Sequence, residues 1–321
     1  MKISVVIAAY CGEKFIGEQL QSIAGQTVPV DEIIICDDSP DGSTRLEIEK
    51  FTGILPIRYF SNISRLGVTG NFNKALHLAA GDIIFLCDQD DVWYPEKTAK
   101  MSSMLTPGEM QAVFCDSDIT DEYGNLQNFT HFESRGYGYL RRAKPGIWQN
   151  QLAESCRRFP AAGHDMALTG TLLKTLLPLP ELPACHDNFL GAAAAALGAW
   201  LICPEALGTF RRHDQSTSKS GGKNSLIRQW QDAKDSIKND SFSWNAALFQ
   251  AVLEKLPKLD DAEKAMLTAR IEHSLARANM NVPLRRRLKM ICREWSSGNY
   301  SRFGRGWKNI IQDVFLRKAD L

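Results

Sequence analysis

Acidic residues gather directly after two apolar segments of this sequence. Residues 37–38 (DD) follow the apolar run 33–36, and residues 88–91 (DQDD) follow the run 83–87. Carboxylates this close repel one another unless they share a cation or accept hydrogen bonds from a ligand. Oxygen-rich sites select hard cations such as Mg²⁺ or Mn²⁺, which bind carboxylates together with substrate phosphates. The sequence therefore predicts a metal-assisted diphosphate site, and the alternative for DDSPDGS is an ordinary turn.

Two common phosphate-binding motifs are absent from the chain. No G-x-G-x-x-G follows the first apolar segment, and no G-x-x-x-x-G-K-[ST] occurs. The sequence thus argues against a nicotinamide-dependent dehydrogenase and against a P-loop ATPase.

Apolar runs and helical patterns alternate in the first part of the chain, which predicts an α/β fold with a parallel sheet. Ligands of such sheets bind outside the carboxyl ends of the strands, where the acidic residues lie. We expect strands at Ile3–Ala9, Glu32–Cys36, Ile57–Phe60, Asp82–Cys87 and Ala112–Cys115. We expect helices at Glu13–Gly25, 43–52, Asn71–Ala80 and Pro95–Leu105.

The rest of the chain changes character twice. Residues 120–185 are rich in Gly, Pro and aromatic residues, which is typical of long irregular loops. The uncharged stretch 188–204 is shorter than a membrane span and predicts a buried helix followed by a strand. A Ser/Gly/Lys linker at 216–225 precedes helical patterns that continue to the end.

The composition is that of a globular protein with separated charges. The 321 residues carry a net charge of +1, which excludes a global basic field for nucleic acid. Residues 281–321 hold ten Lys/Arg against three Asp/Glu, so this segment is +7 and the remainder is −6. The eight cysteines are scattered, which favours free thiols in a reducing cytosol. With no signal peptide recognised at the N-terminus, we predict a cytoplasmic location.

Three blocks of this sequence resemble family 2 glycosyltransferases with a GT-A fold. They are SVVIAAYCGEKFI, DDSPDGS and NISRLGVTGNFNKALHLAAGDIIFLCDQDDVWYPEK. The resemblance covers residues 1–105 and extends more loosely to about 218. DQDDVW, with HDNF and FRRH further on, is similar to the rhamnosyltransferase-like branch, whose members build O-antigen, capsule and other bacterial surface glycans.

The resemblance implies a mostly parallel, Rossmann-like sheet flanked by helices, with a glycosyltransferase domain at 1–218 and a helical C-terminal region at 226–321. It implies an inverting transferase that uses Mn²⁺ or Mg²⁺. The donor would be a nucleotide-diphosphate sugar, either dTDP-rhamnose or a UDP-hexose. The acceptor would be a saccharide or a lipid-linked saccharide.

The resemblance also implies roles for individual residues. Asn71 lies where many relatives carry an Arg-Asn pair, although Phe72 stands here in place of the arginine. The nucleotide-sugar-binding residues would be Ala8, Tyr10, Asp38, Asn71, Asp88, Gln89 and Arg211. The metal would be held by Asp90 and His213, and the acceptor would contact Trp93, Gly163 and His164.

Inversion at an anomeric carbon requires a carboxylate that takes the proton from the acceptor hydroxyl. The resemblance places Asp187 in that role, within the H-D dipeptide that precedes an Ala-rich segment. The alternative is that Asp187 only caps the N-terminus of the helix formed by that segment. For Arg211 and His213 the alternative is a basic surface cluster, and for Trp93 it is a core position.

Two other functions remain as alternatives. Three His-Asp dipeptides, at 164–165, 186–187 and 213–214, are compatible with an HD-type metal phosphohydrolase. That class places its ligands on packed helices, whereas these dipeptides lie in Gly/Pro-containing segments of an α/β chain. The other alternative is a non-catalytic nucleotide-sugar-binding protein on the same fold.

The basic C-terminal segment combines its cations with Trp295, Tyr300, Phe303 and Trp307. One hypothesis is that 281–321 contacts the inner face of the cytoplasmic membrane near lipid-linked acceptors. The alternative is a helical cap whose aromatic residues pack inward.

Overall fold

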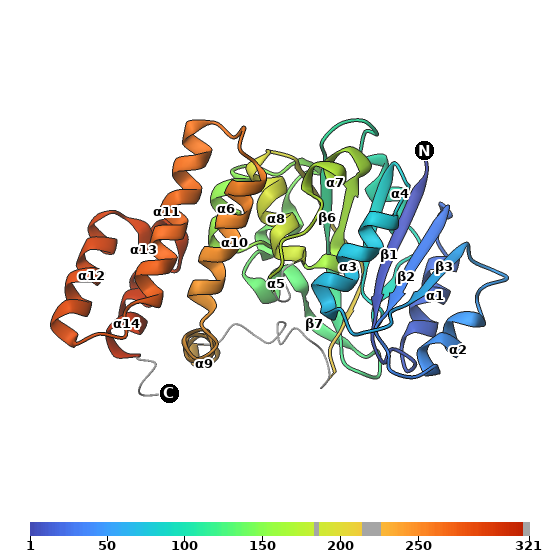
Figure 1. The fold of residues 1–321 in the computed structure, drawn as a ribbon, viewed down its shortest axis with the longest axis horizontal. Helices are drawn as coiled ribbons and strands as arrows, with labels where there is room; N and C mark the ends of the chain where they lie inside the picture. The colour runs from blue at the N-terminus through green and yellow to red at the C-terminus, as the bar shows by residue number, and fades with distance from the viewer. Residues whose placement is uncertain (183–185, 214–225, 317–321) are drawn as a thin grey trace. The chain divides into compact units, whose positions relative to one another are not determined.

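The computed structural model describes residues 1–182, 186–213 and 226–316 (Figure 1). The predicted linker at 216–225 lies outside these ranges. The chain forms two compact units. The first, called the sheet unit, comprises Met1–Gln149, Pro160–Leu190 and Ala199–Gly222, as far as these ranges are described. The second, called the helical unit, comprises the described parts of Asn150–Phe159, Gly191–Gly198 and Lys223–Leu321.

The predicted strands and helices of residues 1–115 are all present, with ends displaced by a few residues. Strand and helix alternate because each apolar run can be buried on both faces only if helices cover the sheet. The elements are β1 (Ile3–Ala9), α1 (Ile16–Ala24), β2 (Glu32–Asp37), α2 (Ser43–Glu49), β3 (Ile57–Ser61), α3 (Gly67–Leu78), β4 (Ile83–Cys87), β5 (Val92–Trp93), α4 (Lys97–Ser103) and β6 (Ala112–Thr120).

The segment 120–185, predicted to be irregular, is instead largely ordered into short elements, so that prediction was wrong. Each element has at most seven residues, which is too short to show a helical or alternating pattern in the sequence. They are β7 (Leu126–Thr130), α5 (His131–Arg135), η1 (Gly138–Arg142), β8 (Gly146–Ile147), α6 (Gln151–Arg157), η2 (Gly163–Asp165), β9 (Met166–Thr169) and α7 (Gly170–Leu176), where η marks a 3₁₀ helix.

The sheet is mostly parallel at one side and mixed at the other. Its strand order is β3-β2-β1-β4-β9-β6-β10-β5, where β10 spans Trp200–Arg211, and Figure 1 shows β1, β2 and β3 side by side. The pairs β2–β3, β1–β2, β1–β4 and β6–β10 are parallel. The short strand β9 is antiparallel to both β4 and β6. The predicted parallel sheet is therefore interrupted at its centre by one reversed strand.

The core of the sheet unit is built from the strands that the sequence marked as continuous apolar runs. All five residues of β4 and all six of β2 are buried, and Trp93 of β5 belongs to the same cluster. The uncharged stretch 188–204 forms a helix followed by a strand, as predicted: α8 (His186–Ala196), then β10. Seven cysteines lie in the described residues as free thiols, and Cys185 lies outside them.

The helical unit contains α9 (Leu226–Lys238), α10 (Ser241–Lys255), α11 (Asp261–Ala278), α12 (Leu284–Ser296), α13 (Asn299–Phe303) and α14 (Trp307–Phe315), with α6 among them. Met280, Ile291 and Tyr300 form a small apolar core between the last helices. Two buried polar contacts join the same helices: Arg277 binds Asp313 with N–O distances of 2.7 and 2.8 Å, and His273 lies 2.7 Å from Glu294. Among the described helices, none combines the length and the apolar character that crossing a bilayer requires.

Gly81 precedes β4 where two backbone segments approach closely. A Cβ at this position would lie 2.8 Å from the Ser4 nitrogen and 2.9 Å from the Ile83 oxygen. We predict that Gly81→Ala lowers the free energy of unfolding by about 1–3 kcal/mol, because backbone must shift to admit the methyl group. Chemical denaturation measures this, with Gly53→Ala as the matched control, since a Cβ there meets nothing within 4 Å. Equal stability of the two variants would contradict the prediction.

Candidate active site at the carboxyl ends of the strands

A cavity of about 530 Å³ opens at the carboxyl ends of β1, β2 and β3. Its lining carries the hydrogen-bonding side chains and the cations that a polar, anionic ligand requires. The lining includes Tyr10, Asp38, Ser39, Asp41, Arg45, Tyr59, Asn62 and Arg65. The Arg65 guanidinium lies 4.0 Å from the centre of the Tyr10 ring, and Tyr10 itself is exposed at the mouth. Ala8 lies next to this edge, in register with Cys36 of β2.

Asp38 anchors one wall of this cavity. Its carboxylate accepts hydrogen bonds from the Leu66 and Gly67 backbone nitrogens at 2.9–3.1 Å and from the Asn62 amide at 2.7 Å. It thus binds the first turn of α3, where a negative charge is favoured by the helix dipole. Asp38 is mostly buried, so the structure gives it a positioning contact in addition to the nucleotide contact predicted for it.

Asn71 lies behind the cavity rather than in its lining. The side-chain amide is buried and donates to the backbone oxygens of Ala9 at 3.2 Å and Cys36 at 2.8 Å, while its oxygen accepts from Asn62. Asn71 therefore joins the ends of β1 and β2. Phe72, which stands where relatives carry an arginine, stacks on the His186 ring at a centroid distance of 4.1 Å.

Gln89 closes the gap between β1 and the acidic residues that follow β4. Its amide oxygen accepts from the Tyr10 nitrogen at 2.9 Å and its amide nitrogen donates to the Tyr10 oxygen at 3.0 Å. Both ends of the side chain are used by one backbone unit. Gln89 thus fixes the start of the DQDD segment against the cavity.

Asp90 pairs with His213, the residue predicted to share a metal with it. The His213 Nε2 lies 2.8 Å from an Asp90 carboxylate oxygen, and both side chains are partly exposed. Asp214, which follows, lies outside the described residues. The pairing arises because β10 runs antiparallel to β5, which brings the end of β10 back to the residues before β5.

Arg211 is held within the protein at several points. Its backbone nitrogen donates to Asp91 at 2.9 Å, its Nε donates to the Asp90 backbone oxygen at 2.9 Å, and its guanidinium also binds the Glu122 oxygen and the Glu18 carboxylate. The side chain is almost fully buried. In the structure Arg211 therefore holds the acidic segment in place, whereas the sequence predicted that it binds nucleotide sugar.

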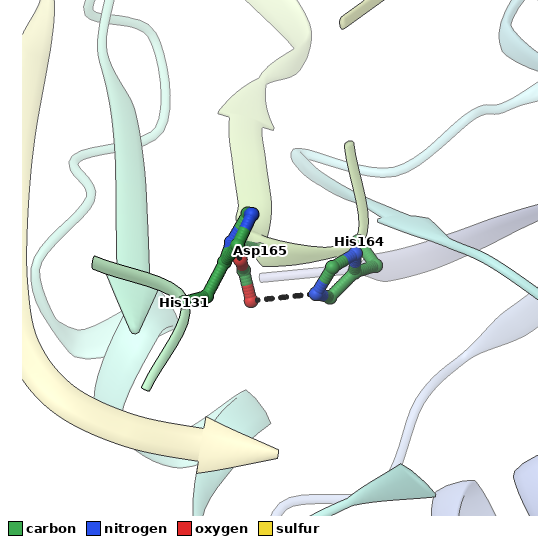
Figure 2. A group of neighbouring side chains, drawn as sticks. All are labelled: His131, His164 and Asp165. Atoms are coloured by element: carbon green, nitrogen blue, oxygen red, sulfur yellow. Dashed lines mark hydrogen bonds and ion pairs between the residues drawn. The ribbon is translucent and has the colours of Figure 1, made fainter. Parts of the chain in front are cut away.

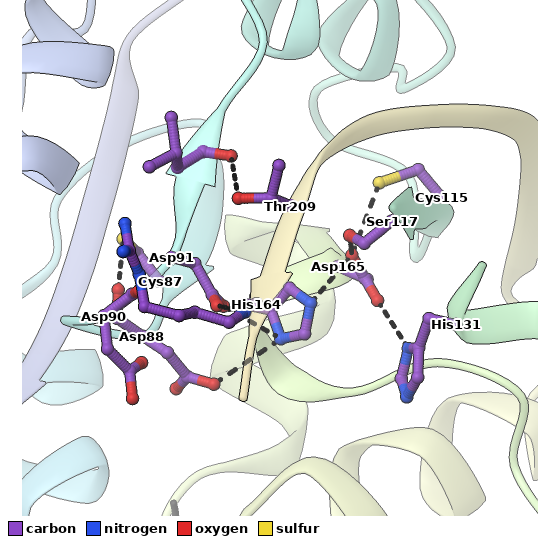
Figure 3. A network of polar contacts seen from close by, with 12 residues as sticks. Cys87, Asp88, Asp90, Asp91, Cys115, Ser117, His131, His164, Asp165 and Thr209 are labelled. Carbon is purple, nitrogen blue, oxygen red and sulfur yellow. Dashed lines mark hydrogen bonds and ion pairs between the residues drawn. The ribbon is translucent and has the colours of Figure 1, made fainter. Parts of the chain in front are cut away.

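His164 occupies the centre of the acidic group (Figure 3). Its Nδ1 lies 3.3 Å from Asp91 and 3.5 Å from Asp88, and its Nε2 lies 3.2 Å from Asp165. Burial lowers the pKa of His164, but the surrounding carboxylates, first of all Asp165, outweigh this and raise it well above its ordinary value. The ring is therefore a buried cation at neutral pH. It also stacks on Phe210 with an interplanar angle of 3°.

The carboxylates around His164 differ in charge. Burial and the neighbouring Asp90 and Asp88 raise the pKa of Asp91 to about 8, despite the opposing effect of His164. For Asp88, burial raises the pKa, but the contact with His164 outweighs it and leaves the pKa below its ordinary value. Asp88 is about one third exposed, whereas Asp91 is buried. Asp88 is thus the ionised member that faces outward.

The same network continues inward to Asp165 and His131 (Figure 2). The His131 Nδ1 lies 3.0 Å from Asp165, which also accepts a hydrogen bond from the Ser117 hydroxyl. Burial raises the pKa of Asp165, yet the charge of His164 and the bonds from both histidines hold it well below its ordinary value. Burial lowers the pKa of His131 to about 4, so this ring is neutral.

Two groups of described residues bring three metal-binding atoms close together: His131, His164 and Asp165, and separately Asp88, Asp91 and His164. The first group is fully buried and already paired internally. The second reaches the surface through Asp88. Neither coincides with the predicted pair of Asp90 and His213.

Lys97 is a functional position that the sequence did not reveal. It is fully buried, its Nζ donates to the His164 backbone oxygen at 2.8 Å, and it lies 5.0 Å from the Trp93 ring centre. Trp93 itself is buried in the main core, so it supports the acidic segment from below. A lysine at the start of a helix is usually exposed to solvent. No pattern in the neighbouring sequence predicts that the Lys97 side chain is buried.

Asp187 lies in the first turn of α8 and is half-buried. Its Oδ1 accepts from the backbone and side-chain nitrogens of Asn188 at 2.8 and 2.9 Å. A Cβ at Gly163 would lie 2.9 Å from His186 and 3.6 Å from the Asp187 Cβ, so α8 begins against the loop that carries His164. The predicted acceptor residues Gly163 and His164 therefore adjoin the predicted base.

The mostly parallel sheet flanked by helices, with a helical C-terminal region, is the GT-A fold. Residues 4–157 match the family model described as glycosyl transferase family 2. The resemblance to family 2 glycosyltransferases is thereby confirmed for residues 4–157, whereas the comparisons do not extend it to the rhamnosyltransferase-like branch.

Two relatives from Escherichia coli are similar to this chain in sequence. The chain is 25% identical over 245 residues to the Escherichia coli UDP-Glc:alpha-D-GlcNAc-diphosphoundecaprenol beta-1,3-glucosyltransferase WfgD, covering 74% of this chain and 87% of that enzyme. It is 36% identical over 112 residues to the E. coli enzyme of the same description, WfaP, covering 35% and 43%.

Solved structures agree in fold. The S. aureus TarS fragment 1–349 in complex with UDP-GlcNAc superimposes with a TM-score of 0.61 at 17% identity, covering 98% of this chain and 90% of that one. The mannosyltransferase PcManGT from Pyrobaculum calidifontis, in complex with GDP-Man and Mn²⁺, gives a TM-score of 0.52 at 17% identity, covering 98% and 84%.

The buried charges of the site lead to a prediction about the stability of the protein. We predict that Asp165→Asn lowers the free energy of unfolding by about 3–5 kcal/mol, because it leaves the buried His164 cation without its main partner. Asp261→Asn, the same change at an exposed carboxylate, is the control and should alter stability by less than about 0.5 kcal/mol. Chemical denaturation measures both. An Asp165→Asn protein as stable as the control would show that His164 is not a buried cation.

Proposed function

We propose that this protein is an inverting, metal-dependent hexosyltransferase that acts in the synthesis of a bacterial surface polysaccharide. The donor is a nucleoside-diphosphate sugar, and the acceptor is a saccharide carried on a lipid diphosphate. The observation that carries this proposal is the juxtaposition of Asp88, Asp90 and His213 at the sheet edge that also holds the polar cavity. The E. coli relatives, which by their names use UDP-Glc and a GlcNAc-diphosphoundecaprenol acceptor, favour a UDP-hexose over dTDP-rhamnose as donor.

The nucleoside of the donor would occupy the cavity beside Tyr10 and Asp38. The aromatic ring offers a stacking surface for the base, and Arg65 and Arg45 supply positive charge for an anionic ligand. Gln89 fixes the Tyr10 backbone, so the cavity and the DQDD segment keep one spacing. That spacing matters because the diphosphate must reach from the cavity to the acidic residues.

Asp90 and His213 fit a Mn²⁺ or Mg²⁺ ion by the chemistry of their donor atoms. A carboxylate oxygen and an imidazole nitrogen already lie 2.8 Å apart, partly exposed, beside the ionised Asp88. An ion bound there would stabilise the negative charge that develops on the leaving nucleoside diphosphate. Arg211 donates to the Asp90 backbone oxygen and so fixes the backbone at the proposed metal site.

We expect Asp90→Asn to raise the Mn²⁺ concentration required for half-maximal transfer by at least about tenfold, because an amide is a weaker ligand than a carboxylate. A Mn²⁺ titration of donor turnover measures this. Glu96→Gln, at a side chain that is 60% exposed, is the control and should leave the requirement unchanged. Identical Mn²⁺ requirements for both variants would remove Asp90 from the proposed metal site.

Asp187 is proposed as the base that accepts the proton of the acceptor hydroxyl. It is half-buried, it adjoins the loop of Gly163 and His164, and its neighbour His186 lies close enough to act on the Asp88 pKa. Substrate bound between the DQDD segment and the start of α8 would therefore have a carboxylate on the acceptor side.

We predict that Asp187→Asn reduces transfer by at least about a hundredfold while donor binding stays within about twofold, since only proton removal is lost. Transfer to a saccharide acceptor and calorimetric binding of UDP measure the two quantities. Asn keeps the shape and the Oδ1 contacts to Asn188, so the helix start is retained. Full activity of Asp187→Asn would exclude it as the base. Donor binding without any transfer by the unaltered protein would favour the non-catalytic alternative.

A further inference from the structure

The last helices of the helical unit turn apolar side chains outward along two stripes. On α12, Leu284, Leu288 and Trp295 are 53%, 41% and 66% exposed, and Cys292 is exposed with them. At about 100° per residue, these four positions lie within an arc of about 80°. One side of the helix thus presents a continuous apolar stripe, which adjoins the side that packs on the core through Ile291, about 20° from Leu284 around the helix.

A second stripe runs along α14. Trp307, Ile311 and Phe315 follow one another at intervals of four residues and are 66%, 40% and 68% exposed. The buried side of this helix carries Asn309, Gln312 and Asp313. Aromatic rings of this helix therefore face outward while several polar side chains are buried, and Ile310 and Val314 pack against the small apolar core. α12 and α14 pack against each other, so the two stripes belong to one region of the unit.

Positive charge accompanies the stripe on α12. Arg285, Arg286, Lys289 and Arg293 are all exposed, and no ion pair within the described residues neutralises them. The acidic residues of the segment 284–315 are Glu294 and Asp313, and both are buried. Glu294 is bound by His273 and Asn299, and Asp313 is bound by Arg277 and Tyr300. The exposed surface of these helices consequently offers cations and apolar groups without a carboxylate.

We infer that α12 and α14 form a docking surface for an anionic lipid bilayer. Helices of this kind lie in the plane of the interface, with apolar side chains among the acyl chains and cations against the head groups. The charge complementarity favours this occupant over a second copy of the chain, since two such surfaces would bring unpaired cations together. The inference goes beyond the proposed function, because docking does not depend on which sugar is transferred.

The structure also corrects part of the sequence hypothesis for this segment. Of the four aromatic residues considered, Tyr300 and Phe303 are buried in the unit, with 1% and 4% exposure. They therefore serve the helical cap. Trp295 and Trp307 remain for the surface. The hypothesis and its alternative thus each describe half of these residues.

Sedimentation of the full chain with vesicles tests the inference. We expect binding to vesicles that contain phosphatidylglycerol and at least tenfold weaker binding to phosphatidylcholine alone. Binding should weaken as salt is raised above about 0.1 M, because the charges are screened. Replacing Arg285, Lys289 and Arg293 together by Gln should reduce binding to the anionic vesicles by about a hundredfold, at roughly fivefold for each cation.

Two apolar variants complete the test: Leu288→Ser with Trp295→Ser, and Trp307→Ser with Phe315→Ser. Each should reduce vesicle binding at least tenfold, whereas the control Ile54→Ser with Leu126→Ser, at comparably exposed apolar residues of the sheet unit, should not. Unchanged melting temperatures and unchanged transfer to a soluble acceptor would show that fold and active site are intact. That readout also separates failure of docking from failure of the proposed function.

Three results would overturn the inference. The first is an unaltered protein that binds no anionic vesicle. The second is vesicle binding by the variants equal to that of the unaltered protein. The third is a dimer in sedimentation velocity that both apolar variants abolish, which would assign the stripes to a second copy of the chain.

Discussion

The arrangement of this site depends on one buried positive charge, the imidazolium of His164. Removing an ion from water costs several kcal/mol, so an interior cation persists only among close partners. Asp165 supplies the main one, Asp88 and Asp91 supply two more contacts, and Lys97 binds the backbone oxygen of the same residue. The dependence is mutual, because neighbouring carboxylates would repel one another without a cation among them, and burial with Asp90 and Asp88 nearby already raises the pKa of Asp91 to about 8.

The reversed strand β9 is what brings His164 to that place. In a parallel strand, residues that precede the strand lie at the amino edge of the sheet, away from the ligand site. Because β9 is antiparallel to β4 and β6, with Ala167 opposite Phe85 and Met166 opposite Phe114, its preceding residues lie beside the residues that follow β4. The same reversal occurs where β10 meets β5 and brings His213 to Asp90. Both histidines reach the carboxylates through antiparallel neighbours in a sheet that is otherwise mostly parallel.

The acidic side chains are distributed differently in the two units. In the sheet unit, carboxylates converge on the strand ends, and one of them, Asp88, stays ionised and outward-facing. In the helical unit, the acids of the last helices are turned inward, where Arg277 and His273 bind them. The net charge of +1 is therefore a cancellation between an acidic site and a basic outer surface. Each distribution suits a different ligand chemistry, a metal-bound diphosphate in one case and an anionic surface in the other.

The strands of residues 1–115 and the acidic residues at their carboxyl ends were largely predictable from the sequence by itself. The apolar runs, their order and the acidic residues that end them are local features, and β1, β2 and β4 follow from runs that are buried on both faces, whereas β3 is only partly buried. The family resemblance rests on the same segments. The C-terminal charge separation was also visible, because counting charges needs no coordinates.

Only the tertiary structure decided how these parts meet. β9 has four residues and α5 has five, which is too short for a periodic pattern, so neither the reversal of β9 nor the burial of His131 could be read from the sequence. The roles of Lys97, Asn71 and Arg211 are set by partners that lie 35–121 residues away along the chain. The sequence also does not show which of Tyr300 and Trp295 is buried, since both are aromatic and they are only five residues apart. Burial distinguishes them, and burial is a property of the packed helices rather than of the residue types.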